Sequence, residues 1–234
     1  MIAGERRRND LAQYDELAGQ WWDPRGPFCM LHWLAASRAE HIPPAPRPDA
    51  VLVDLACGAG LMAPHVNRLG YRHVGVDITE SALRLAAAHG VAPVRGSVLA
   101  VPLADGCADV VVAGEVLEHV ADDVAVLAEC ARLLKPGGTL VVDAVAATRL
   151  ADLVAVRIVE RIRGAPRGIH DPALFVDRAG LLAAAERLGL ELRLVGLRPS
   201  VRDVLGWLRR RRETVRMRPT RITAVLFAGY GRKR

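Results

Sequence analysis

Residues 51–60, VLVDLACGAG, constrain the fold of this chain more than any other stretch. A short apolar run that ends in an acid and continues into two glycines is typical of a buried strand, a tight turn and the start of a helix. Gly58 and Gly60 allow the backbone a positive φ and let a ligand approach without a Cβ in the way. The helix expected from about Leu61 points its free N–H groups at the same place. The stretch therefore predicts a cradle for a small molecule, and a purely structural turn is the alternative.

Two cofactors suit such a cradle. Residues 58–63, GAGLMA, satisfy the loose G-x-G-x-x-G/A fingerprint of dinucleotide-binding folds, and Asp77 ends the next expected strand, where an acid binds the ribose. This pattern favours an NAD-dependent oxidoreductase. The longer stretch 54–60, DLACGAG, instead resembles the first motif of class I S-adenosylmethionine (SAM)-dependent methyltransferases, in which an acid closes the strand ahead of the glycines. Asp77 suits either cofactor as the ribose ligand.

The order of apolar runs predicts the fold class. Strand patterns are found at residues 51–55, 72–77, 91–95, 109–113 and 139–145, and helical patterns at 60–69, 79–88 and 122–134. Strands that alternate with helices at this spacing predict an α/β fold with a parallel, doubly wound sheet. A ligand of such a sheet lies beyond the carboxyl ends of its strands, where Asp54, Asp77 and Glu115 stand. A helix over 175–188 and strands over 191–198 and 223–230 are expected to follow.

Further motifs extend the resemblance over most of the chain. GVD at 75–77, VVVAGEVLEHV at 110–120 and LLKPGGTL at 133–140 resemble the later class I methyltransferase motifs. QYDELAGQWWDPRGPF at 13–28 and GIHD at 168–171 resemble the ubiquinone-biosynthesis O-methyltransferase family. The resemblance implies a Rossmann-like sheet with an antiparallel last strand and SAM as the cofactor. It further implies methyl transfer to a phenol or catechol hydroxyl, on a polyprenylated quinone precursor or a related aromatic metabolite.

The same resemblance implies a set of cofactor contacts. They are Asp54, Gly58, Gly60, Asp77, Ser97, Val98 and Gly114. Asp54 would order the loop or reach the amino group of the methionine part. Ser97 stands where many such enzymes carry an acid near the adenine, so the adenine contacts are left open.

The candidate catalytic residues lie in GEVLEHV at 114–120. Methyl transfer from a sulfonium needs an oxygen held in line, but a phenol of pKa about 10 is protonated near pH 7. Glu115, Glu118 and His119 stand at i, i+3 and i+4, on one side of a helical turn. With His170 as a fourth ligand implied by the resemblance, they suit Mg²⁺, Mn²⁺ or Zn²⁺, which would lower the pKa of a bound catechol. His119 acting alone as a general base is equally consistent, with Glu115 as a second catalytic candidate.

Two segments surround the expected fold. Residues 1–48 are expected to form a helical lid and a proline-rich linker, ahead of a methyltransferase domain at 49–234. Three of the four tryptophans lie in this segment and would cover a ligand or pack on the core.

Residues 146–170 form the second segment, an amphipathic insertion. Its apolar side is Ala151, Val154, Ala155, Ile158, Val159 and Ile162, and its polar side is Arg149, Asp152, Arg157, Glu160, Arg161 and Arg163. A packed helix fits this pattern, as does an interfacial helix that takes a lipid-tailed substrate from an anionic membrane.

Charge and composition indicate which binding partners and which cellular location to expect. The net charge is +6, and residues 199–234 hold eleven Lys or Arg and two acidic residues, a net of +9. The run 209–212, RRRR, suits phosphates or anionic lipid, or else a solvated face. A non-catalytic SAM- or RNA-binding module is therefore a second alternative, although nucleic acid is the less favoured partner. No apolar run reaches about eighteen residues and MIAGERRRND lacks the core of a signal peptide, so we expect a cytoplasmic protein, with a peripheral membrane contact as the alternative.

Overall fold

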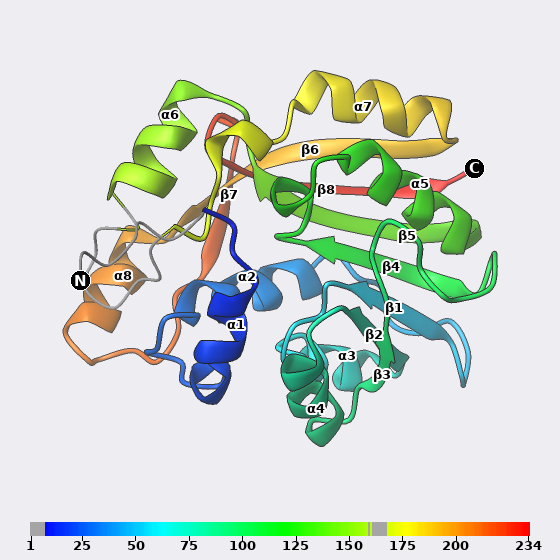
Figure 1. Cartoon of the computed structure of the whole chain (residues 1–234), viewed down its shortest axis with the longest axis horizontal. Coiled ribbons are helices and arrows are strands. Elements are labelled where there is room, and N and C mark those ends of the chain that lie inside the picture. The colour runs from blue at the N-terminus through cyan, green and yellow to red at the C-terminus, as the bar shows by residue number, and fades with distance from the viewer. Residues whose placement is uncertain (1–7, 159, 161–167) are drawn as a thin grey trace.

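A mixed eight-stranded sheet forms the centre of the computed structural model, which describes residues 8–158, 160 and 168–234 (Figure 1). The strand order is β3-β2-β1-β4-β5-β8-β6-β7. The strands are β1 (Val51–Leu55), β2 (Arg72–Asp77), β3 (Ala92–Arg95), β4 (Ala108–Gly114), β5 (Leu134–Val145), β6 (Leu190–Pro199), β7 (Met217–Thr220) and β8 (Leu226–Lys233). The predicted α/β sheet is confirmed.

The first five strands are mutually parallel, whereas β8 runs antiparallel between β5 and β6. Val142 of β5 and Leu194 of β6 both pair with Gly229 of β8. The antiparallel last strand expected from the resemblance is thus confirmed. The edge strand β7 is an addition that the sequence patterns did not predict.

Helices cover both faces of the sheet. The α-helices are α1 (Ala12–Glu16), α2 (Cys29–Ala39), α3 (Ala63–Leu69), α4 (Glu80–Ala88), α5 (Asp123–Leu133), α6 (Arg149–Ala151), α7 (Arg178–Arg187) and α8 (Val201–Leu208). Short 3-10 turns are η1 (Ala18–Gln20), η2 (Leu117–His119) and η5 (Pro172–Leu174), and η3 (Asp152–Ile158) is a wider π-type turn that continues α6. Among the described residues, no helix is long and apolar enough to cross a bilayer.

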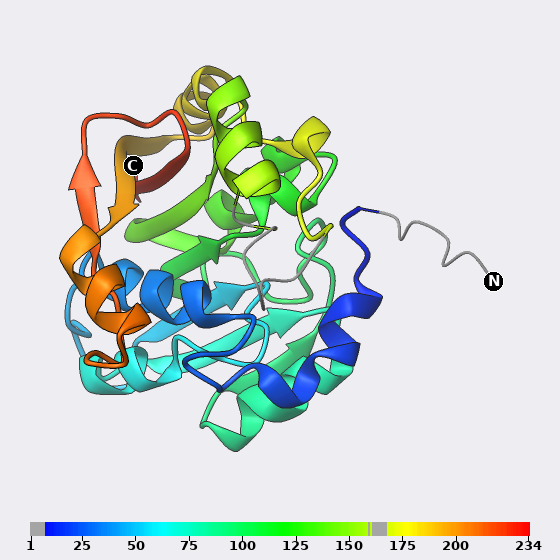
Figure 2. The same cartoon turned by 90° about the vertical axis from the view of Figure 1, so that its left-hand side faces the viewer.

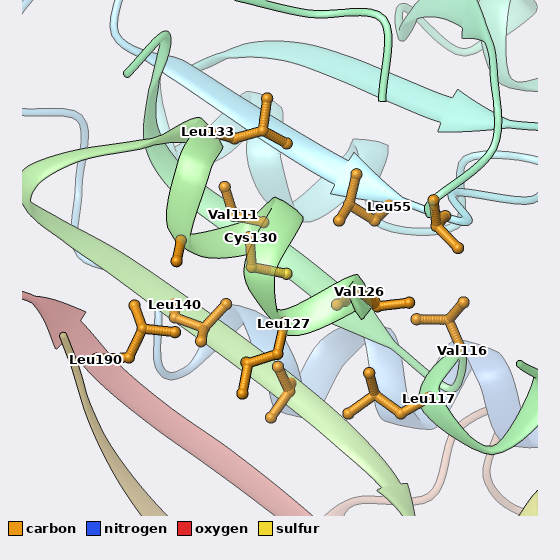
Figure 3. Close-up of a cluster of buried hydrophobic side chains, with 14 of the residues drawn as sticks. Leu55, Val111, Val116, Leu117, Val126, Leu127, Cys130, Leu133, Leu140 and Leu190 are labelled. Carbon is orange, nitrogen blue, oxygen red and sulfur yellow. The ribbon is translucent and has the colours of Figure 1, made fainter. Parts of the chain in front are cut away.

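Strand β4 shows why residues 110–113 in the middle of the sheet are all apolar. Val111 packs in one hydrophobic cluster with Leu127 of α5, while Val110 and Val112 pack in another with Ala35 of α2. Side chains alternate between the two faces of a strand, so a strand that is covered on both faces needs apolar residues at every position. Figure 3 shows the first cluster, in which Val111 and Leu140 of the sheet lie against Leu127 and Cys130 of α5.

The insertion after β5 is packed on the domain where the structure describes it. Ala151 and Ala155 are buried in a cluster with Val145 and Phe175, as a packed helix would require. Glu160, expected on the solvated side, is buried as well. The side chain of Ile158 and all of Val159, Ile162, Arg161 and Arg163 lie outside the described residues. A membrane contact through this insertion therefore stays a prediction.

Candidate functional site

The glycine loop between β1 and α3 adopts the backbone that its sequence predicts. Gly58 and Gly60 have φ values of +52° and +77°. A Cβ on Gly60 would lie 3.0 Å from Cα of Ala86, so this glycine allows the loop to pack closely on α4. A Cβ on Gly58 would lie 2.7 Å from the ring of Trp21. Gly60 therefore allows close packing on helix α4, whereas Gly58 allows close packing of the N-terminal segment.

Asp77, at the end of β2, connects this loop to the neighbouring strand. Its Oδ2 accepts the N–H of Gly58 at 2.9 Å, and its Oδ1 accepts the N–H of Thr79 at 2.8 Å. Burial raises the pKa of Asp77, although these two N–H groups act to lower it. Each carboxylate oxygen has a second lone pair, so Asp77 can order the loop and still accept hydrogen bonds from a ribose.

The N-terminal segment covers the glycine loop with aromatic rings. Trp21 stacks on Phe28 with ring centroids 4.1 Å apart, and Tyr14 stacks beside them. Trp22 donates its indole N–H to the carbonyl of Ala59 at 3.1 Å. The indole N–H of Trp21 is buried without a hydrogen-bond partner, so a donor next to the loop is left for a ligand.

The other expected cofactor residues differ in what they contact. Asp54 is buried in β1, with Oδ2 3.4 Å from Nε2 of His73. The exposed Ser97 accepts the N–H of Leu99 at 3.2 Å within a local turn. Val98 packs in the main hydrophobic cluster. The structure therefore brings Gly58 and Asp77 together, whereas Val98 serves the core.

Arg38 and Asp143 form a buried ion pair that the sequence analysis missed. Arg38 of α2 binds both carboxylate oxygens of Asp143 of β5, through Nε and through Nη2 at 2.9 Å. The guanidinium occupies the space where a Cβ on Gly114 would lie, which explains the glycine at that position. Asp143 also accepts the N–H of Glu115 at 3.0 Å. An acid inside the apolar strand 139–145 was the available signal, because buried charges need partners.

Glu115 and Glu118 lie next to this pair. Glu118 is fully buried, and its Oε1 accepts the N–H of Val145 at 3.2 Å while Oε2 has no partner. Burial raises the pKa of Glu118 to about 8. Burial also raises the pKa of Glu115 well above its usual value, and the nearby Glu118 adds to this. Oε1 of Glu115 is likewise buried without a partner.

Asn9 determines which nitrogen of His119 carries the proton. Nδ2 of Asn9 donates to the carbonyl of His119 at 2.9 Å, and Oδ1 of Asn9 lies 2.8 Å from Nδ1 of the same ring. A backbone carbonyl can only accept a hydrogen bond, so the Asn9 atom that faces it must be the amide nitrogen. The Asn9 oxygen then faces the His119 ring, and Nδ1 of the ring must carry the proton. Burial lowers the pKa of His119 to about 3, and His170 adds to this effect. His119 is therefore neutral, with a free lone pair on Nε2.

His170 lies beside His119 and is held by Glu160. The two imidazole centroids are 5.7 Å apart, and Nδ1 of His170 is 3.5 Å from Oε1 of Glu160. Glu160 also accepts the N–H groups of Gly168 at 2.9 Å and of His170 at 3.2 Å. Burial of Glu160 acts to raise its pKa, but these hydrogen bonds outweigh it and lower the pKa to about 2.

The four candidate metal ligands do not form a preassembled metal site. Within the described part of the chain, no three His, Cys, Asp or Glu residues are grouped so that they could hold a metal ion. Glu118 turns its Oε1 to the N–H of Val145, whereas Nε2 of His119 faces away from the Asn9 side chain that holds Nδ1. A divalent cation at these four residues therefore stays a prediction, as does the general-base role of His119.

Comparisons with known proteins agree with the glycine loop and the sheet. A family model described as a methyltransferase domain matches residues 53–142. The ubiquinone biosynthesis O-methyltransferase of Ralstonia nicotianae is 37% identical over 191 residues, which cover 78% of this chain and 80% of that protein. The enzyme of the same name from Thiobacillus denitrificans is 35% identical over 191 residues, covering 78% of this chain and 82% of its own length.

Two solved structures of SAM-dependent methyltransferases share the fold. A SAM-dependent methyltransferase from Thermotoga maritima has a TM-score of 0.67 at 20% identity and covers 95% of this chain and 97% of its own. A second, from Mesorhizobium loti, has a TM-score of 0.60 at 16% identity and covers 85% of this chain and 96% of its own. The methyltransferase family match and the similar O-methyltransferases support SAM rather than NAD as the cofactor of this chain. The chain is a SAM-dependent O-methyltransferase and belongs to the family of the ubiquinone biosynthesis O-methyltransferases.

Proposed function

We propose that this enzyme methylates a phenol or catechol hydroxyl on an aromatic acceptor with a polyprenyl tail. The names of the similar enzymes, which place them in ubiquinone biosynthesis, support this acceptor class. The observation that carries the proposal is the His119 ring, which Asn9 holds through Nδ1 so that the lone pair of Nε2 faces away from Asn9. A phenol is the kind of hydroxyl that needs such a base, because it is protonated near neutral pH.

The residues around the loop fit SAM. Asp77 presents a carboxylate at the end of β2, where it also orders the glycine loop through the N–H of Gly58. The unpartnered indole N–H of Trp21 and Oε1 of Glu115 are further polar groups near the carboxyl ends of the strands. When bound, SAM supplies a methyl group on a sulfonium, which is already a good leaving group. The protein therefore has to hold the acceptor oxygen in line and take its proton.

His119 would take that proton at Nε2, and Asn9 would act on it as a positioning residue. The hydrogen bond from Nδ1 to Asn9 keeps the ring orientation and leaves the basic nitrogen facing away from Asn9. His170, on the neighbouring loop, lies beside the ring and borders the same place.

Methyl transfer from labelled SAM to a water-soluble catechol tests this assignment. We expect His119→Ala to lower kcat by about 10²- to 10⁴-fold. Asn9→Leu should lower kcat with little change in KM, and Asn9→Asp should restore part of the rate because it keeps the acceptor oxygen. S-adenosylhomocysteine should bind all three variants as tightly as wild type. Wild-type turnover in a folded His119→Ala variant would contradict the general-base role.

A requirement for a divalent cation is a separate proposal, and the same methyl-transfer assay tests it. Excess chelator should leave turnover unchanged if His119 acts alone. Loss of turnover with unchanged S-adenosylhomocysteine binding would instead indicate a cation that assembles together with the acceptor, at Glu115, Glu118, His119 or His170.

A further inference from the structure

Helix α8 exposes an apolar stripe to solvent. Val201, Leu205 and Leu208 are 66%, 45% and 63% exposed. They stand at i, i+4 and i+7, so they share one face of the helix. Exposed single leucines are common on protein surfaces, but three aligned on one short helix form a continuous patch.

The opposite side of α8 is fixed on the domain. Trp207 meets Trp33 of α2 edge to face at 5.4 Å, and the guanidinium of Arg25 lies 5.2 Å above the Trp207 ring. Arg25 also donates to the carbonyls of Trp207 at 3.0 Å and Arg212 at 2.8 Å. The fully buried Asp203 accepts from Arg216 at 2.9 Å. Because these contacts hold the helix, the stripe cannot turn inward.

Exposed arginines flank the stripe. Arg202 lies on α8, and Arg209, Arg210 and Arg211 follow its last turn, all of them exposed. Arg212 is directed back toward Asp203, with a separation of 3.3 Å. Three arginines of the RRRR run are therefore presented beside the leucines, in the most basic part of the chain.

The stripe lies on the side of the molecule where the parallel strands end. In Figure 1, β8 runs toward the C-terminus on the right, so the antiparallel β5 ends on the left, where α6 and α8 also lie. Figure 2 shows both helices on this face. Leu150 and Leu153, at α6 and the start of η3, are each 46% exposed there. Because β1, β2 and β4 run parallel to β5, the site residues that follow them lie toward the same end of the sheet.

We propose that α8, with Arg209, Arg210 and Arg211, docks on the surface of an anionic lipid bilayer. An apolar stripe bordered by arginines complements acyl chains bordered by anionic headgroups, and arginines near such a surface strengthen the attraction. Docking by this face would turn the active-site side toward the membrane, where a lipid-tailed acceptor resides. The orientation rests on the proposed function, but the docking itself does not.

Co-sedimentation of the full chain with vesicles, without cofactor or acceptor, tests the docking. Wild type should bind phosphatidylglycerol-containing vesicles, lose binding as salt rises, and bind pure phosphatidylcholine weakly. We expect the Leu205→Asn/Leu208→Asn double variant to reduce the apparent partition coefficient by about tenfold or more. The Arg209→Gln/Arg210→Gln/Arg211→Gln triple variant should reduce it by a similar factor.

Matched controls separate this surface from general effects of charge and apolarity. Ile222→Asn removes an equally exposed apolar side chain elsewhere, and Arg68→Gln/Arg72→Gln/Arg187→Gln removes the same charge from other exposed positions. Both should bind vesicles nearly as wild type does. Undiminished vesicle binding by the folded leucine variant would overturn the proposal. The proposal would also be overturned if the wild-type chain failed to bind anionic vesicles and instead bound RNA, or self-associated in a way that the α8 variants abolish.

Discussion

Asp77 is the residue through which two neighbouring strands share one cofactor loop. It stands at the end of β2 and accepts the N–H of Gly58, which follows β1. This contact is possible because β1 and β2 are parallel neighbours, so their carboxyl ends meet at one edge. The loop conformation therefore depends on the same carboxylate that we expect to accept hydrogen bonds from the ribose of SAM.

Replacing Asp77 with Asn should weaken binding of S-adenosylhomocysteine by about 10- to 100-fold. The amide has one accepting oxygen and no charge, and a hydrogen bond to a charged group contributes about 1.5–3 kcal/mol. Isothermal titration calorimetry measures the affinity, with the exposed Asp49→Asn as a control variant. Wild-type affinity in a folded Asp77→Asn protein would remove Asp77 from the cofactor site.

Among the elements, the N-terminal segment depends most on packing at a distance. α1 and η1 are too short to be stable alone, since isolated helices below about 12 residues are marginal in water. They are held by the stack of Tyr14, Trp21 and Phe28 over the glycine loop. The segment expected to be a lid is thus anchored by aromatic contacts in this structure.

Truncating Phe28 to Ala should lower the free energy of unfolding by about 3–5 kcal/mol. The ring is buried and stacked on Trp21, so its removal leaves a cavity and loses the contact. Urea unfolding followed by tryptophan fluorescence measures the change, and Leu182→Ala, at an exposed site, should cost far less. Equal effects of the two variants would mean that the stack does not hold the segment.

Across the whole molecule, Asp109 connects three parts of the chain at the amino ends of the strands. It accepts hydrogen bonds from Arg47 of the linker at 2.6 Å, from Lys135 at 2.8 Å and from the N–H of Val51 at 2.9 Å. Burial of Asp109 acts to raise its pKa, but these hydrogen bonds outweigh it and hold the pKa well below its usual range. A group whose pKa is lower in the folded state stabilises the fold above its unfolded pKa.

Asp109→Asn should therefore destabilise the protein at pH 7 and matter less in acid. We expect a loss of about 1 kcal/mol at pH 7, reduced by solvent screening of the Arg47 pair. The difference from wild type should shrink as pH falls below about 4, the usual unfolded value, because the unfolded wild-type chain then takes up a proton at Asp109 before the folded protein does. Urea unfolding at pH 7 and pH 3 measures it, and a difference that grows in acid would contradict the assignment.

The sequence by itself determined the fold class and the conformation of the glycine loop. A positive φ at Gly58, apolar residues at 110–113 of β4 and alternating strands and helices all follow from local patterns. Family motifs along the chain were sufficient to indicate SAM-dependent O-methylation, which the similar enzymes confirm. Such features depend on residues close in sequence, so they can be recognised without tertiary structure.

Tertiary structure decided which polar groups meet. Arg38 with Asp143 and Asn9 with His119 are more than a hundred residues apart, and a single polar residue has no periodicity that would identify its partner. Likewise, the helical pattern alone placed Glu160 on the solvated side. In the structure its buried carboxylate contacts the N–H groups of Gly168 and His170 and the imidazole of His170. Whether the stripe on α8 faces solvent was decided by Trp207 and Asp203, because a helix exposes the side that its neighbours leave uncovered.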